Sequence, residues 1–351
     1  MLLIDGRQGE GGGQIVRTCL ALSAVTGRAF RIVGVRGNRS RPGLRPQHLT
    51  AVRAAAAICN ASLVGDVLDS TTLEFRPTDR PRGGDYEFDI AQASSSGHSA
   101  GAVTLLVQAI LWPLVFSDRP SRLIVHGGTF VPHSPPYHYL EEVARPGFMR
   151  FGATFITEIR RWGWMAAGGG SMLVNIEPAD RLENAHFEPV PWTEVSGVAA
   201  VTNLPSHIPH RMARRAHNLL ATAGLSPQIQ PIRERGAGPG AGIVLWGSQA
   251  GFSRLGRKGL PAEKVAEGAV AELLAFLDNG SAVDHYLADQ LLLPMALAKG
   301  SSSFTTSRLT QHTLTVVELL RKWLDIHIDV VGNLDEPGEI IINGYGMVRE
   351  E

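Results

Sequence analysis

The chain has 351 residues, of which 44% are hydrophobic, and its 33 Lys and Arg balance 33 Asp and Glu, so the formal net charge is zero. This length suggests about two domains with buried cores, and the composition excludes a disordered chain. Neutrality argues against a protein that coats nucleic acid along its length, because such proteins are usually basic. Any contact with nucleic acid should therefore be local.

Cysteine usage and the N-terminus bear on the compartment. Cys19 and Cys59 lie inside apolar helix-like runs, and we interpret them as reduced core residues, which favours the cytoplasm. The N-terminus lacks a basic-then-apolar signal pattern, and no apolar run reaches membrane-spanning length. We therefore expect a soluble, cytoplasmic protein.

Helix and strand patterns follow the same order three times along the chain. Residues 14–25 have helical apolar spacing, RAFRIVGV alternates like a strand, QHLTAVRAAAAIC is helical, and two short strands follow. The order recurs from GAVTLLVQAILWPLVF to GSMLVNIEP, and again from DHYLADQLLLPMALA to EIIING. Two helices can cover one face of each small sheet, so three units can share one core. The alternative is a shared α/β periodicity without a true repeat.

Residues 181–279 break this order and predict a smaller inserted α/β domain. HIPHRMARRAHNLLATAG is helical, SPQIQPIRE is strand-like, and AEKVAEGAVAELLAFLDNG is an amphipathic helix closed by Gly280. The glycine-rich RERGAGPGAG leads into a strand rather than a helix, so we interpret it as a flexible loop and not as a phosphate loop. The predicted three-unit domain comprises residues 1–180 and 280–351.

A glycine-rich turn, residues 9–13, joins the first strand to the first helix and is the first candidate site. Glycines let the backbone approach a ligand closely, and free N–H groups at a helix start favour an anion. Glu10 would repel phosphate unless a divalent cation bridges them, and Arg17 lies one to two turns into the helix. A plain tight turn with a surface glutamate explains the same letters.

The next loop carries four arginines, Arg36, Arg39, Arg41 and Arg45, just before a helix start. Guanidinium groups so close repel one another unless anions are present, and their forks suit phosphate oxygens. The alternative is a solvated loop with scattered charge.

Two later helices carry further candidates. In HYLADQ, Tyr286 and Gln290 share a helix face. The tyrosine ring could therefore stack on a base, and the glutamine amide could hydrogen-bond to the edge of that base. A capped surface helix explains the same residues. His312 lies at a helix start, which lowers the pKa of a histidine and keeps it neutral, as a nucleophile requires. Gln-His also opens a helix at His48, so position alone does not choose between His48 and His312, and either can be purely structural.

Taken together, these stretches resemble the RNA 3′-terminal phosphate cyclase family. The resemblance rests on DGRQGEGGGQIVRT, RPGLRPQHLTAVRAAAAIC, FRPTDRPRGGDYEFDI, AAGGG and HYLADQLLLPMALA, with His312 downstream, and runs through most of residues 2–345. It implies a mixed α/β (α+β) fold. A large domain of three repeated units, each with two helices and a four-stranded sheet, would carry a smaller α/β insert and be related to the enolpyruvyl transferase architecture.

Two segments depart from the family pattern. GGTFVPHSPP carries Phe130 and Val131 where relatives often have polar residues. SSSGHSAGAVTLL also differs, although it should still bring a serine- and glycine-rich turn to the site. Neither change removes an expected catalytic group.

The resemblance implies a ligase-type nucleotidyl-transfer enzyme that uses ATP. A histidine attacks the α-phosphate and becomes adenylylated, AMP passes to an RNA 3′-phosphate, and the neighbouring 2′-hydroxyl then closes a 2′,3′-cyclic phosphate. By matching position, His312 is the nucleophile, Glu10 holds Mg²⁺ or Mn²⁺, and Arg17, Arg36 and Arg39 act on the phosphates. The expected ATP-binding residues are Gln47, Gln108, Pro132, Tyr286, Leu287, Ala288, Asp289 and Gln290, with adenine between Tyr286 and Pro132.

Two other functions compete with this one. A non-catalytic relative, an RNA-binding or ribosome-assembly protein of the same fold, would lack the nucleophile, so His312 favours the enzyme. An enolpyruvyl transferase rests on fold analogy alone and would need six units, for which the chain is too short. The expected partners are RNA 3′-phosphate ends, without a membrane and with a homodimer as one option.

Overall fold

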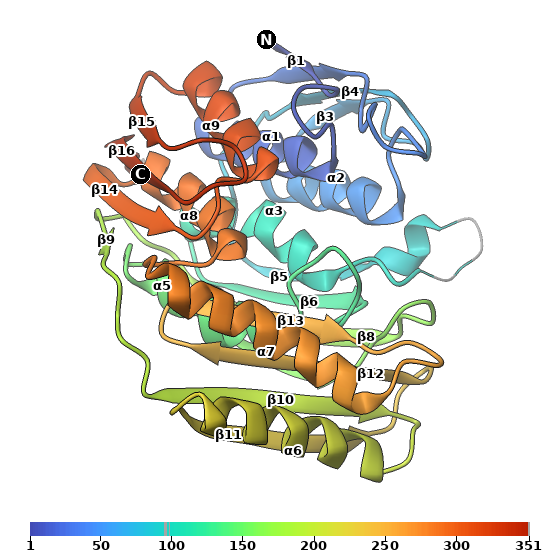
Figure 1. Ribbon diagram of the computed structural model, residues 1–351. Helices are drawn as coiled ribbons and strands as arrows, with labels where there is room; N and C mark the ends of the chain where they lie inside the picture. The colour runs from blue at the N-terminus through green and yellow to red at the C-terminus, as the bar shows by residue number, and fades with distance from the viewer. Residues whose placement is uncertain (95–96, 98, 350–351) are drawn as a thin grey trace.

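The computed structural model describes residues 1–94, 97 and 99–349 and contains four small sheets with helices between and beside them (Figure 1). The first unit consists of β1 (Leu2–Asp5), α1 (Gly13–Thr26), β2 (Phe30–Val33), α2 (Pro46–Cys59), β3 (Ser62–Val64) and β4 (Thr72–Arg76). Its strand order is β1-β2-β4-β3, in which β1 and β2 are parallel and the other pairs are antiparallel.

The second unit repeats this topology with the strand order β5-β6-β8-β7. Its elements are β5 (Asp85–Asp89), η1 (Ile90–Ala93), α3 (Val103–Val115), β6 (Ser121–Gly127), α4 (Tyr137–Tyr139), η2 (Leu140–Ala144), α5 (Arg145–Met149), β7 (Thr154–Arg161) and β8 (Gly170–Glu177). The segments α4, η2 and α5 follow one another without a break, and the π-helical turn of η2 comes just before Pro146, whose ring cannot fit a regular helix interior.

The third unit has the same topology again, in the order β9-β14-β16-β15. It comprises β9 (His186–Phe187), α8 (His285–Leu297), β14 (Lys299–Thr306), α9 (Gln311–Trp323), β15 (His327–Val331) and β16 (Gly338–Tyr345). The first strand of each unit is parallel to the second, and the last lies between the second and third. The predicted threefold repeat is thus confirmed, and each unit begins with a strand that the helix-first pattern left out.

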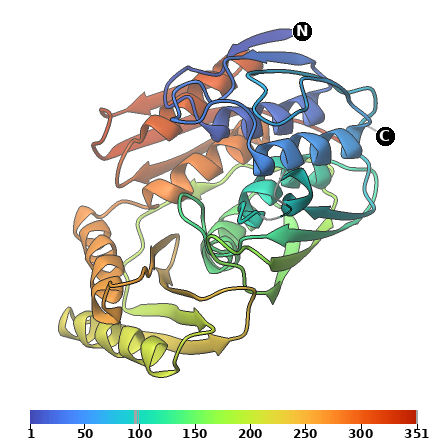
Figure 2. The ribbon, with the colours of Figure 1, turned by 90° about the vertical axis from the view of Figure 1, so that its right-hand side faces the viewer.

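The fourth sheet lies in the sequence between β9 and α8 and has a different connectivity, β11-β10-β12-β13. Its elements are β10 (Glu194–Thr202), α6 (His207–Thr222), β11 (Ser226–Glu234), β12 (Gly240–Gly247), β13 (Ala250–Leu255) and α7 (Ala262–Asn279). With α6 it lies at the end of the molecule away from β1 in both views (Figures 1 and 2).

Hydrophobic residues form two large clusters. The first joins the three units through residues such as Ile15, Leu106 and Leu291, and also holds the free cysteines Cys19 and Cys59, as predicted. A separate cluster lies between the fourth sheet and its helices. Phe187 of β9 belongs to the first cluster although it lies inside the predicted insert, and the domain boundaries at 181 and 279 remain a prediction.

A smaller apolar cluster joins the fourth sheet to the second unit. Phe130, Trp162 and Trp164 pack there against Val198 and Val244. No helix in the described ranges is both long and apolar enough to cross a membrane.

Candidate active site

The glycine-rich turn is held between the starts of α2 and α9. Gly9 has φ +56°, a conformation that favours glycine, and a Cβ added there would lie 2.1 Å from Oγ1 of Thr315. A Cβ added at Gly13, the first residue of α1, would lie 2.2 Å from Nε2 of His48. Any larger residue at these positions would push the turn away from both helices.

Three of the predicted motifs meet at Glu10. One oxygen of its carboxylate contacts the guanidinium of Arg39, and the other contacts Nε2 of His312. Asn38 fixes the arginine loop to the turn, because its Nδ2 donates to the carbonyl oxygens of Arg7 at 2.6 Å and Gly9 at 3.2 Å. The turn, the arginine loop and the start of α9 therefore form one site.

His312 is the second residue of α9, a helix that begins with a side-chain cap. The Oγ1 of Thr310 accepts a hydrogen bond from the N–H of Thr313 at 3.1 Å, which fixes the first turn. Burial lowers the pKa of His312 below its usual 6.5, Arg17 and Arg39 lower it further, and Asp289 opposes them. Because the side chain is still 40% exposed, a neutral imidazole is available to a ligand at pH 7.

Arg17 and Asp289 form the inner wall of the site. Burial lowers the pKa of Arg17 to about 10, and burial raises the pKa of Asp289 to about 6 although His312 and Arg17 both lower it. The two side chains line a small cavity of about 40 Å³ with Gln14, Gln108 and Gln290. Nε2 of Gln108 donates to Oε1 of Gln290 at 2.6 Å, which ties α3 to α8.

Arg36 and Gln47 shape the arginine loop and its exit. Nη1 of Arg36 donates to the carbonyl oxygens of Arg41 at 2.8 Å and Gly43 at 2.9 Å. Burial, with Arg45 nearby, lowers the pKa of Arg36. Gln47, the second residue of α2, accepts from the N–H of Ala102 at 3.1 Å and so links the loop to the second unit.

The two expected faces of the adenine pocket, Tyr286 and Pro132, are both exposed. The Tyr286 side chain is 43% exposed, and its ring neighbours are His285 and Tyr139, at centroid distances of 3.9 and 6.3 Å. Pro132 is an exposed residue after β6. Their sandwich of adenine remains a prediction.

Three other expectations for this region have different outcomes. Leu287 and Ala288 belong to the hydrophobic core, and their contact with nucleotide also remains a prediction. Phe130 and Val131 are buried in apolar clusters, which explains why polar residues are absent there. In the serine- and glycine-rich segment, Ser95, Ser96 and His98 lie outside the described residues.

Sequence reasoning missed Asp284, which positions α8. Its carboxylate accepts hydrogen bonds from the N–H groups of Tyr286 at 2.6 Å and Leu287 at 2.8 Å, from the N–H of Gly251 at 2.8 Å and from the hydroxyl of Tyr139 at 2.9 Å. An aspartate directly before a helical run is an N-cap signal that could have identified it.

Glu10 is the candidate metal ligand of the site. Within the described part of the chain, no group of three or more His, Cys, Asp or Glu side chains could hold a metal ion. A single carboxylate suits Mg²⁺ only when substrate phosphates supply further oxygen ligands. The donor set therefore fits a metal that arrives with a phosphorylated ligand.

Comparison with known proteins adds to this geometry. A family model described as RNA 3′-terminal phosphate cyclase matches residues 8–330. A protein of that name from Gloeothece citriformis is 46% identical over 99% of this chain and 100% of its own length. Another from Methylococcus capsulatus is 42% identical over 99% of this chain and 97% of its own length.

A solved structure, the enolpyruvyl transferase NikO from Streptomyces tendae, is 14% identical with a TM-score of 0.38. The match covers 99% of this chain and 49% of that chain, and its score is too low to argue from. The family model and the high identity over nearly the full length are decisive, and this chain belongs to the RNA 3′-terminal phosphate cyclase family of enzymes.

Proposed function

We propose that this cyclase consumes ATP and works through AMP bound covalently to His312. The observation that carries the proposal is the convergence of Glu10, Arg39 and Arg17 around a half-exposed histidine of lowered pKa. A neutral imidazole beside cationic side chains is what attack on a triphosphate requires.

In the first step, the lone pair of His312 Nε2 attacks the α-phosphorus of ATP. A nitrogen–phosphorus bond forms, the bond from the α-phosphorus to the bridging oxygen breaks, and pyrophosphate leaves with that oxygen. We assign Nε2 because it faces Glu10 and the glycine turn. Nδ1 keeps its proton, so the ring of the adduct carries a positive charge beside the anionic phosphoryl oxygen and can later leave as a neutral imidazole.

The surrounding residues stabilise the charge that develops on the phosphates. Arg17 and Arg39 supply guanidinium groups near His312, and the start of α1 supplies backbone N–H groups. Glu10 would hold Mg²⁺ or Mn²⁺ together with ATP phosphates, and that ion would neutralise part of the phosphate charge.

Two further transfers complete the reaction. An oxygen of the RNA 3′-phosphate attacks the phosphorus of the bound AMP, the nitrogen–phosphorus bond breaks, and an anhydride joins the RNA to AMP. The neighbouring 2′-hydroxyl then attacks the 3′-phosphorus, loses its proton and expels AMP. His312 returns to its neutral form for the next turnover.

Protein labelling tests the proposal. Incubation with ATP labelled at the α-phosphate and a divalent metal should leave an acid-labile label on the peptide that contains His312. ATP labelled at the γ-phosphate is the matched control and should leave none. Labelling of the His312→Ala variant, or transfer of the γ-label, would contradict the mechanism, and RNA binding without any label would indicate a non-catalytic relative.

A metal titration tests Glu10 separately. We expect Glu10→Ala to adenylylate slowly at low metal concentration and to recover partly at high concentration, because one ligand of the ion is lost. Glu318→Ala removes an exposed carboxylate of α9 that contacts Gln8 and should behave as wild type. Identical titration curves for Glu10→Ala and wild type would reject the metal role.

A further inference from the structure

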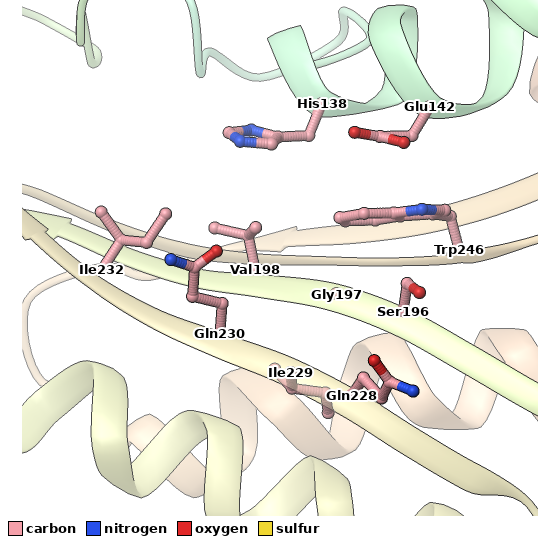
Figure 3. Close-up of a pocket in the computed structure, with 10 residues that line it drawn as sticks. All are labelled: His138, Glu142, Ser196, Gly197, Val198, Gln228, Ile229, Gln230, Ile232 and Trp246. Atoms are coloured by element: carbon pink, nitrogen blue, oxygen red, sulfur yellow. The ribbon is translucent and has the colours of Figure 1, made fainter.

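A second and much larger cavity lies away from the glycine turn. It has a volume of about 520 Å³, within the ~300–1,000 Å³ typical of ligand sites, and lies between one face of the fourth sheet and the helical segment α4–η2 (Figure 3). We call it the Trp246 pocket, and the residues that line it include His138, Glu142, Ser196, Gln228, Gln230 and Trp246.

The strand register forms the floor of the Trp246 pocket. Ser196 of β10 pairs with Trp246 of β12 and with Gln228 of β11, so these three side chains share one face of the sheet. Gln230 lies two residues beyond Gln228 on the same face. The other face packs against α6 and α7, which leaves an indole and two amides directed at the cavity (Figure 3).

The roof comes from one face of a helical segment, because His138 and Glu142 are four residues apart. Nδ1 of His138 has no hydrogen-bond partner within the described ranges. Burial lowers the pKa of His138 to about 4, so the ring is a neutral hydrogen-bonding group at pH 7. The planes of His138 and Trp246 differ by only 24°.

This lining selects a flat, hydrogen-bonding ligand and disfavours a phosphate. Among the described residues that line the pocket there is no Lys or Arg, and the carboxylate of Glu142 would repel an anion. Proteins bind single-stranded RNA by stacking splayed bases on aromatic rings and by hydrogen-bonding their edges through amides and carboxylates. Trp246, Gln230 and Glu142 offer these groups together.

The helical segment that forms the roof of the pocket also contacts the start of α8. Tyr139, next to His138, donates its hydroxyl to Asp284, the residue that caps α8. Helix α8 carries Asp289 and Gln290 to the inner wall of the site. One short helical segment thus connects the pocket with the proposed nucleotide-binding helix.

We propose that the Trp246 pocket binds an unpaired base of the RNA substrate, upstream of the 3′-phosphate that is held near His312. The assignment rests on the proposed function, since it takes RNA as the substrate. The base stacks on Trp246 and bonds to Gln230 and Glu142, while its phosphates stay outside in solvent. This contact gives the enzyme a preference for single-stranded ends.

Binding measurements without ATP test this site independently of adenylylation. The probe is a fluorescent single-stranded RNA with a 3′-phosphate, followed by anisotropy. Trp246→Leu should raise its Kd about tenfold, and Trp246→Phe should restore most of the affinity. Tyr345→Leu is the matched control, because it removes an exposed aromatic side chain of β16 outside the pocket and should leave the Kd unchanged.

A substrate lacking one base makes the test specific. An RNA with an abasic site at the contacting position should bind about tenfold more weakly, and Trp246→Leu should weaken it no further. The tenfold effect of Trp246→Leu should be the same at 50 and 200 mM salt, because stacking releases no counterions. The proposal would be overturned if Trp246→Leu weakened binding further wherever the abasic site was placed in the RNA. It would also be overturned if the Trp246→Leu variant bound RNA like wild type.

Two more variants guard against misfolding and a different occupant. Gln230 is exposed on the edge strand β11, so Gln230→Leu should not disturb packing. This variant should bind the RNA severalfold more weakly. Glu142→Gln keeps a hydrogen-bond acceptor and should cost less than about threefold. If Glu142→Gln abolishes binding of an arginine-containing peptide while RNA binding is unaffected by every pocket variant, the pocket is a cation site and the proposal is wrong.

Crosslinking places the base directly. An RNA with 4-thiouridine at single positions upstream of the 3′-phosphate should crosslink at one position to the β12 peptide that contains Trp246. Crosslinks confined to α8, α9 and the glycine turn would overturn the pocket assignment. Self-adenylylation in the absence of RNA reports on His312 alone, so a failure of either proposal can be told from a failure of the other.

Discussion

The starts of α2 and α9 occupy equivalent places in the first and third units, and both carry a Gln-His pair whose histidine lies against the glycine turn. Only 5% of His48 is exposed, and its Nδ1 accepts from the N–H of Arg45 at 3.3 Å. The His312 side chain is 40% exposed and reaches Glu10 with its Nε2. The repeat therefore reproduces the position of a histidine, and the surroundings decide whether it can meet a ligand.

The charges around the two rings differ as well. Burial holds the pKa of His48 well below its usual range, and Arg17, Arg36, Arg45 and Arg39 lower it further. His312 is less buried, and Asp289 partly offsets the arginines beside it. His48 is thus suited to stay neutral inside the site wall, whereas His312 combines neutrality with access.

The largest expected effect separates the two histidines by activity. His312→Ala should slow self-adenylylation by about 10³-fold or more, because the nucleophile is lost. His48→Gln should stay within about tenfold of wild type, because its ring only supports the turn. Quantitative labelling with α-labelled ATP measures both. A label that persists in His312→Ala and vanishes in His48→Gln would reverse the assignment.

A glycine substitution tests how closely His48 is held. The Cβ of Gly13→Ala would lie 2.2 Å from His48 Nε2, so we expect a loss of about 1–3 kcal/mol in the free energy of unfolding. Combining it with His48→Ala should recover much of that loss. Gly147→Ala in α5 is the control, since its Cβ would meet Leu291 at an ordinary 3.4 Å. Additive losses in the double variant would show that the turn does not press on His48.

The pH dependence of stability provides a smaller contrast. Because the folded pKa of His48 is lower than the ordinary 6.5, the unfolded chain binds more protons below pH 6.5, and stability falls as the pH falls. Between pH 7 and 5 this contributes up to about 2 kcal/mol. Urea unfolding should show that His48→Gln loses less stability than wild type over this interval. Equal losses of stability in wild type and His48→Gln would mean that His48 becomes protonated in the folded state.

The smallest expected effect concerns the low-pH side of the pH profile of adenylylation. Adenylylation should rise with pH as His312 loses its proton, at a pKa below 6.5. Arg39→Gln removes a nearby cation, which raises that pKa and moves the limb to higher pH. Arg41→Gln is the matched control, because Arg41 lies in the same loop but is not among the groups that shift the pKa of His312, and it should leave the midpoint in place. The comparison uses single-turnover labelling rates across pH.

Much of the fold was readable because each unit carries strong local patterns. The helices α1, α2, α6, α7 and α9 match apolar spacings in the sequence, and Gly280 ends α7 with φ +71°, as the C-cap rule predicts. The sequence patterns did not predict the strands β5, β9, β10 and β13. The strand β9 has two residues, and β10 is a nearly continuous run of small and apolar residues, so neither shows alternation.

The sequence revealed the separate motifs of the candidate site but not how they are arranged in space. Periodicity placed His312 at a helix start and Glu10 in a turn, but their contact joins residues from opposite ends of the chain, and no local pattern encodes that. In the same way, no local pattern encodes that His48 is buried whereas His312 is 40% exposed. The Trp246 pocket depends on strand register, which sets the shared face of Ser196, Gln228 and Trp246.

The split third unit has a consequence for synthesis on the ribosome. β9 is made early, but its sheet partner β14 emerges only after the whole fourth sheet and α7 have been translated. Glu10 must likewise wait for His312, because α9 is translated only after the fourth sheet, α7 and α8. Under the proposed mechanism, a nascent chain cannot form the adenylate before α9 has emerged, and products terminated before α9 cannot trap cellular ATP as a dead-end adenylate.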